Sequence, residues 1–228
     1  MKRNILLTGL VFLCFAGFSQ SKKFANDIKQ ALYIHDTASS AASEAVALSA
    51  FKDLTEKYPN EWLPSYWTAY LSTQVFRLKA RPDFPKDLDP NEVLLDSKTY
   101  LEKSKTIKGE MTEREQSDFL MLEGFIYGFL KFSVPEEEEG PFVEQEKRKY
   151  QEAMKYNSRN PLMYVMKGIT LLQEEDYQDI VAGIGLLDYA EQTFEKSENR
   201  GLTTYWNKDF IKFWRSRGEE KLKGLLEG

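Results

Sequence analysis

Side chains with the chemistry of a catalyst are scarce in this sequence. It contains one histidine, His35, and one cysteine, Cys14. A serine–histidine–acid arrangement would have to use His35, and Asp36 beside it is a neighbour in sequence, not a partner placed to orient the imidazole. Gly-x-Ser-x-Gly, His-Glu-x-x-His and glycine-rich phosphate-loop motifs do not occur. We therefore expect a helix-end or solvent-exposed His35 and a protein that is not an enzyme.

Acidic residues are plentiful and gather in three runs. The runs are Glu136–Glu139, then Asp83, Asp87 and Asp89, and finally Glu174, Glu175, Asp176 and Asp179. Two carboxylates facing each other about 5–10 Å apart across a cleft could act on a glycan. Adjacent glutamates usually stay solvated, and these runs lack the alternating spacing of a calcium loop. We expect no metal site and no cofactor, with weak cation binding at Glu136–Glu139 as the open alternative.

The N-terminus has the pattern of a secretory signal peptide. Lys2 and Arg3 precede an uncharged apolar run over residues 5–18, and small residues follow at the offsets for cleavage between Ser19 and Gln20. The run is too short for a comfortable membrane span. The pattern predicts export to the periplasm or the cell exterior, with no membrane insertion after cleavage.

Removal of the predicted signal peptide, residues 1–19, leaves residues 20–228 as a single domain. The chain has 31 basic and 36 acidic residues, so loss of Lys2 and Arg3 gives a net charge of −7. Loss of Cys14 leaves no disulfide, and the core alone must hold the fold. The acidic balance argues against nucleic acid and against anionic membrane surfaces as partners.

Apolar residues recur at helical spacing along the whole chain, and no strand pattern competes. Capping signals mark several helix starts: Asp89 before Pro90, Thr112 with Glu115, and Asn160 before Pro161. For the helix from residue 40 the expected caps are Asp36, Thr37 or Ser39. The pattern predicts a short first helix ending near 35–37, then helices over 40–58, 60–78, 90–108, 112–132, 142–157, 161–174 and 180–196. A last helix follows Gly201, and Lys221, Leu222, Leu225 and Leu226 are expected to extend it after Gly218.

Residues 150–172 resemble the tetratricopeptide repeat family. The small, turn and bulky positions of that family are matched by Ala153, Asn160-Pro161, Tyr164, Gly168 and Leu171. Gly168 is expected to let the preceding helix pack closely. The resemblance implies an all-α fold: a tetratricopeptide-like α-solenoid of about four antiparallel helix pairs plus a C-terminal closing helix. The run EWLPSYW followed by AY over residues 61–70, together with the Asn160-Pro161 turn, is similar to secreted bacterial envelope proteins of unassigned role.

Three long connections, over residues 79–90, 133–141 and 174–179, each fall inside a predicted helix pair. Equivalent turns line up along one edge of a stacked array. We therefore expect all three connections at the same edge. Insertions on one edge often mark the functional side.

The resemblance also implies a non-catalytic interaction or scaffold module that binds a protein, peptide or helix in a concave groove. The residues that would line the groove are Tyr66, Tyr70, Thr73, Gln74, Met121, Phe125, Phe129, Val165, Ile169 and Gln173. This surface is apolar and aromatic, with a few amides and no cluster of lysines and arginines. The alternatives are a groove filled by a terminal helix, a homodimer contact, a small carboxylate-dependent envelope enzyme and a purely structural envelope component.

Overall fold

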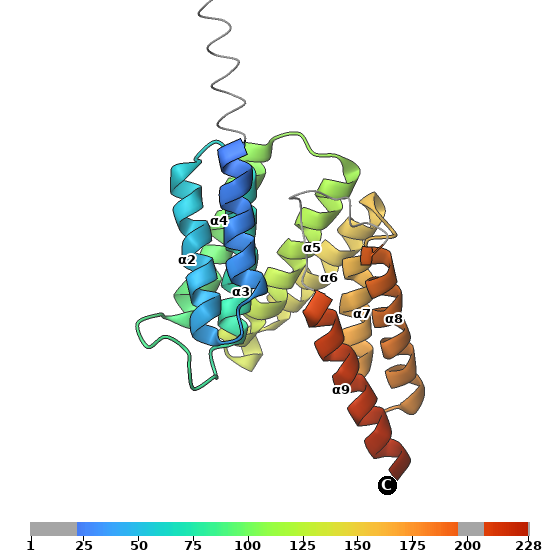
Figure 1. Cartoon of the computed structure of the whole chain (residues 1–228). Coiled ribbons are helices and arrows are strands. Elements are labelled where there is room, and N and C mark those ends of the chain that lie inside the picture. The colour runs from blue at the N-terminus through green and yellow to red at the C-terminus, as the bar shows by residue number, and fades with distance from the viewer. Residues whose placement is uncertain (1–21, 196–207, 228) are drawn as a thin grey trace, which may run out of the picture.

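The computed structural model describes residues 22–195 and 208–227, and within these ranges the chain is all-α with no strand (Figure 1). The predicted signal peptide and Trp206 lie outside them. The helices span residues 22–36, α2 Ala41–Lys57, α3 Trp62–Arg77, α4 Pro90–Lys108, α5 Glu113–Leu130, α6 Gly140–Tyr156, α7 Pro161–Gln173, α8 Tyr177–Glu195 and α9 Lys208–Glu227. Two short 3-10 turns, η1 Lys131–Ser133 and η2 Glu136–Glu138, connect α5 to α6. None of the described helices is long and apolar enough to cross a membrane.

Most helix starts follow the local capping signals. Asp89 and Asn160 each accept the backbone N–H two residues ahead, and Thr112 forms a reciprocal capping box with Glu115. The expected cap of α2 was wrong. Ser40 is extended and forms a capping box with Ser43, because the chain remains helical to residue 36.

The last helix continues past Gly218, as the sequence predicts. α9 runs without a break from Lys208 to Glu227. A β-carbon at Gly218 would lie 2.7 Å from Leu172 and 2.9 Å from Ile184. The glycine therefore allows α9 to approach α7 and α8 closely.

Successive helices run up and down, and they pack most strongly in antiparallel pairs. Those pairs are α3 with α4, α5 with α6, and α7 with α8. Contacts of Asp27 with Lys57 and of Phe24 with Tyr58 join the helix over 22–36 to α2 in the same way. The connections after α3, α5 and α7 all lie at the lower end of the array in Figure 1, as the sequence predicts.

α3 is the most deeply buried element. Every residue from Leu63 to Phe76 is buried, and α3 packs between α2 and α4 and also contacts α5. The sequence predicts burial on two sides for the helix over 112–132. The corresponding α5 contacts α3, α4, α6 and α7, so it lies in the middle of the row.

Glycines set the closest helix contacts. A β-carbon at Gly124 would lie 2.5 Å from the ring of Tyr150 in α6. Gly168 faces Gly183 and Leu187 of α8, the following helix. The expectation that Gly168 accommodates the preceding helix was therefore wrong: periodicity shows that a close approach occurs, but not which neighbour makes it.

Candidate functional site

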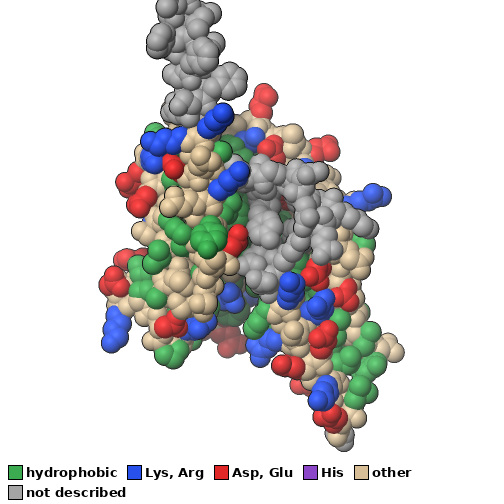
Figure 2. Space-filling model, viewed as in Figure 1, with side chains coloured by type: hydrophobic (Ala, Val, Ile, Leu, Met, Phe, Trp, Pro, Cys, Tyr) green, Lys and Arg blue, Asp and Glu red, His purple; other side chains and the backbone are tan. Residues whose placement is uncertain are grey.

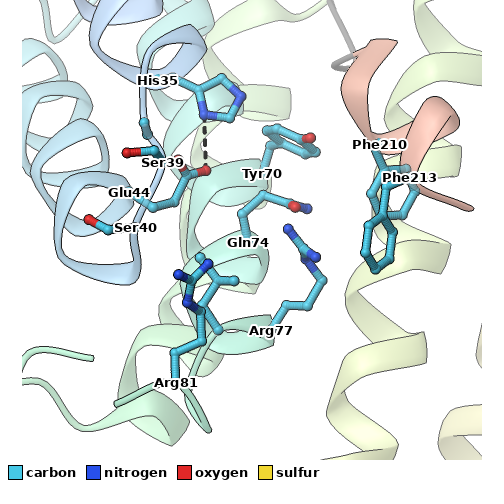
Figure 3. A pocket seen from close by; sticks show the side chains of 12 residues that line it. His35, Ser39, Ser40, Glu44, Tyr70, Gln74, Arg77, Arg81, Phe210 and Phe213 are labelled. Carbon is cyan, nitrogen blue, oxygen red and sulfur yellow. Dashed lines mark ion pairs between the residues drawn. The ribbon is translucent and has the colours of Figure 1, made fainter. Parts of the chain in front are cut away.

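A half-open pocket of about 270 Å³ lies where four segments meet. These are the end of the helix over 22–36, the start of α2, the C-terminal half of α3 with the turn after it, and the start of α9 (Figure 3). Its lining is formed by His35, Ala38, Ser39, Ser40, Glu44, Tyr70, Gln74, Arg77, Leu78, Arg81, Phe210 and Phe213. Segments far apart in sequence therefore build one polar and aromatic site.

His35 lies near the end of its helix, which is one of the two positions expected for it. It is buried, so the other expectation, a solvent-exposed histidine, was wrong. The residue is 5% exposed and lies beside the rings of Trp67 and Tyr70. Its Nδ1 atom lies 2.9 Å from Oε1 of Glu44, which is also buried. The packing of the helix over 22–36 against α2 and α3 causes this burial, and sequence adjacency does not reveal it.

Two arginines, one helical turn apart, form the cationic side of the pocket. Arg77 ends α3, and its guanidinium lies 5.8 Å from the ring centroid of Phe210. Arg81 follows in the connection to α4, and its Nε donates to Asp83 at 3.1 Å. The sequence predicts no basic cluster on the groove surface, so this pair changes the chemistry expected there.

Asp83 positions this connection. Its Oδ2 accepts the backbone N–H of Ala41 at 2.7 Å, while Oδ1 accepts from Arg81. Partial burial acts to raise the pKa of the Asp83 carboxyl, but the Ala41 N–H and the Arg81 guanidinium outweigh it and hold that pKa below its ordinary value. The connection after α3 is thereby tied to the first turn of α2 and orients Arg81 at the pocket.

Of the predicted groove residues, two line this pocket: Tyr70 and Gln74. They are 3% and 4% exposed, so they form its inner wall. Thr73 is buried in α3, and its hydroxyl donates to the carbonyl of Tyr70 at 2.6 Å.

The other predicted groove residues lie elsewhere. Tyr66, Met121, Phe125, Val165 and Ile169 are buried in the core, each 8% exposed or less. Phe129 is half-buried against Phe76 and Phe125, and Gln173 is exposed at the far end of α7.

α9 covers part of the face on which the groove is predicted. The ring of Phe210 lies 6.3 Å from that of Phe125, edge to face. The same residue approaches Arg77 of α3. This packing corresponds to the alternative in which a terminal helix fills the groove. The pocket lies at one end of the face that α9 covers.

The pocket lining contains a single carboxylate, Glu44. The hydroxyls of Ser39 and Ser40 point away from the imidazole in Figure 3, and Ser40 is engaged in the α2 capping box. Among the residues that the structure describes, no group of three or more His, Cys, Asp or Glu side chains could hold a metal ion.

Figure 2 shows basic and acidic side chains interspersed over the face that it draws, including the surroundings of the hollow beside the start of α9. The chain as a whole has a net charge of −5.

Comparisons with protein-family models, curated proteins and solved structures found no match for this chain. From the sequence, His35 is considered only as a catalytic residue, and none of Glu44, Arg77, Arg81 and Phe213 is placed at a site. Arg77 and Arg81 carried a weak signal, since Arg77 ends an otherwise apolar helix and Arg81 follows four residues later in the connection. No signal in the sequence indicates that these arginines pack near α9.

Proposed function

We propose that the protein is a non-catalytic interaction module, exported to the periplasm or beyond, which binds a segment of another protein at the pocket between α3 and α9. We further propose that its helix pairs form a tetratricopeptide-like solenoid that α9 closes. The turn at Asn160-Pro161 supports this architecture, as does the placement of three long connections at one end of the array.

One observation carries the choice of site. At the pocket, Tyr70 of the aromatic interior forms the inner wall, and the exposed residues Arg77 and Arg81 lie beside it. Aromatic and arginine side chains are the residue types that dominate binding free energy at interfaces. Phe213 of α9 is 46% exposed at the same pocket, and an exposed large aromatic of this kind suits contact with a partner.

A second candidate, acid–base catalysis, is favoured by the buried contact between His35 and Glu44. A carboxylate beside Nδ1 orients an imidazole for proton transfer. The pocket offers no nucleophile facing the ring and no second carboxylate, so binding has the stronger support.

The test is site-specific photo-crosslinking in the native envelope. A photoreactive phenylalanine analogue replaces Phe213, and the matched control carries it at Phe132, which is 60% exposed on η1 away from the pocket. We expect a protein adduct, identified by mass spectrometry, from position 213 and not from position 132. Equal labelling at both positions, or none at either, would remove this pocket as the binding site.

A further inference from the structure

We infer that the pocket recognises an anionic group, a carboxylate or a phosphate, carried next to an aromatic or apolar group of the ligand. The inference rests on the proposed function, since it names the chemistry of the segment that the pocket binds. Three features carry it: guanidinium N–H donors and a buried imidazole nitrogen that have no partner among the described residues, and an aromatic wall.

Both arginines have guanidinium N–H donors without an acceptor in the described part of the chain. Within the described ranges Arg77 makes no ion pair and no side-chain hydrogen bond, and its guanidinium lies 5.8 Å from the ring centroid of Phe210. Arg81 uses Nε for Asp83, while its Nη groups have no hydrogen-bond partner in the described part of the chain. Figure 3 shows the Arg77 guanidinium directed toward Gln74. Guanidinium groups bind carboxylate and phosphate through paired N–H donors.

His35 supplies the second, independent observation. Its side chain is 5% exposed, and its Nε2 atom has no hydrogen-bond partner in the described structure. Figure 3 shows Nδ1 turned to Glu44 and the other ring nitrogen on the opposite side, toward Tyr70. A buried polar atom without a partner costs free energy. With Nδ1–H directed at Glu44, Nε2 donates to an anion in the pocket when the ring is in its imidazolium form.

The charge balance at the pocket favours an anion. The lining holds two arginines and one carboxylate, Glu44, which contacts the histidine. Asp83 beside the lining pairs with Arg81, so Arg77 is the lining guanidinium that has no ion pair among the described residues. The chain as a whole is acidic, with a net charge of −5, so a positive pocket does not follow from composition. Positive charge in a concave site concentrates anions and speeds their association.

The aromatic wall determines what the anion is attached to. Phe210 and Phe213 enter from α9, and Tyr70 lines the pocket from α3. Aromatic rings prefer edge-to-face or offset contacts with other rings. A ligand carrying an aromatic ring next to its acid group would therefore use the rings and the arginines together.

The experiment uses matched small probes and NMR titration of the mature protein. The probes are N-acetyl-phenylalanine, its uncharged amide, and phenyl phosphate. We expect the acid to shift the Gln74 side-chain amide signals and the Arg77 and Arg81 Nε signals, and the amide to bind at least about tenfold more weakly. Comparison of the acid with phenyl phosphate shows whether the pocket prefers a carboxylate or a phosphate.

Charge-removing variants test whether the arginines are responsible. Arg77→Gln and Arg81→Gln are both at exposed positions, so each should keep the melting temperature of the wild type. Each should weaken acid binding about tenfold, whereas Arg159→Gln, at an exposed arginine in the turn before α7, should leave it unchanged. Raised salt should weaken acid binding in the wild type.

Two outcomes separate this inference from the proposed function. If acid and amide bind equally, or if the Arg77→Gln and Arg81→Gln variants bind the acid as the wild type does, anion recognition is overturned. An adduct from position 213 in the crosslinking experiment would then still support the interaction module. If no adduct forms there while the acid binds through both arginines, the anion site stands and its ligand is not a protein segment.

Discussion

Substituting Gly183 with alanine tests how tightly α7 and α8 are packed. A β-carbon at this position would lie 2.9 Å from the carbonyl oxygen of Gly168, 3.1 Å from Cδ2 of Leu172 and 3.2 Å from Cβ of Leu171. A backbone oxygen and a β-carbon cannot move aside as a flexible side-chain end can. The two helices must therefore separate by a few tenths of an ångström.

Gly185 provides a control two residues away in the same helix. A β-carbon there meets nothing within 4 Å. Both glycine-to-alanine changes gain about 1 kcal/mol of helix propensity, so this gain cancels when the two variants are compared. Overpacking costs about 1–3 kcal/mol, and Gly183→Ala should be less stable than Gly185→Ala by that amount.

Thermal and urea unfolding of the mature protein measure this difference. For a chain of this size each kcal/mol corresponds to about 2–4 °C in melting temperature. Gly185→Ala should melt above the wild type and Gly183→Ala several degrees below Gly185→Ala. If the two variants melt at the same temperature, the close contact of α7 with α8 at Gly168 and Gly183 is refuted.

Three further predictions concern other parts of the chain. Asn160→Ala removes the α7 cap and the buried hydrogen bonds of the Asn160 amide to α5, and should cost about 2 kcal/mol by urea unfolding. Burial acts to raise the pKa of Glu123, but Lys105 and Lys149 hold it below its ordinary value. Its contribution to stability is therefore complete above the unfolded pKa and is lost as pH falls through the folded pKa, so Glu123→Gln should flatten the acid side of a stability–pH curve. Mass spectrometry of the exported protein should give Gln20 as the N-terminal residue; a chain beginning at Met1 would contradict the signal peptide.

Much of the helical framework is readable from local signals. Asp89 before Pro90 and Asn160 before Pro161 identify helix starts because each cap satisfies backbone N–H groups within two residues. Such signals need no knowledge of the rest of the chain. The cap of α2 was missed because Ser39 and Ser40 are both capping residue types, and only the end of the preceding helix decides between them.

The candidate site was only partly predictable, since it depends on contacts between distant segments. Tyr70 and Gln74 were identified through the face of α3, which is a local property. The pocket also needs α9, whose Phe210 meets Arg77 across more than half of the chain length. Helical periodicity gives the face that a helix buries but not the neighbour that covers it, and the same ambiguity produced the wrong neighbour for Gly168.

The course of α9 has a consequence for how the protein unfolds. In a row of helix pairs that touch only their neighbours, each pair can melt almost independently, and cooperativity decays with distance along the row. α9 packs on α8 and α7 and also meets Phe125 of α5 and Arg77 of α3. It links early and late pairs directly, so melting of either end removes contacts from the other. The array should therefore lose its structure in one transition, and removing α9 should broaden that transition into separate steps.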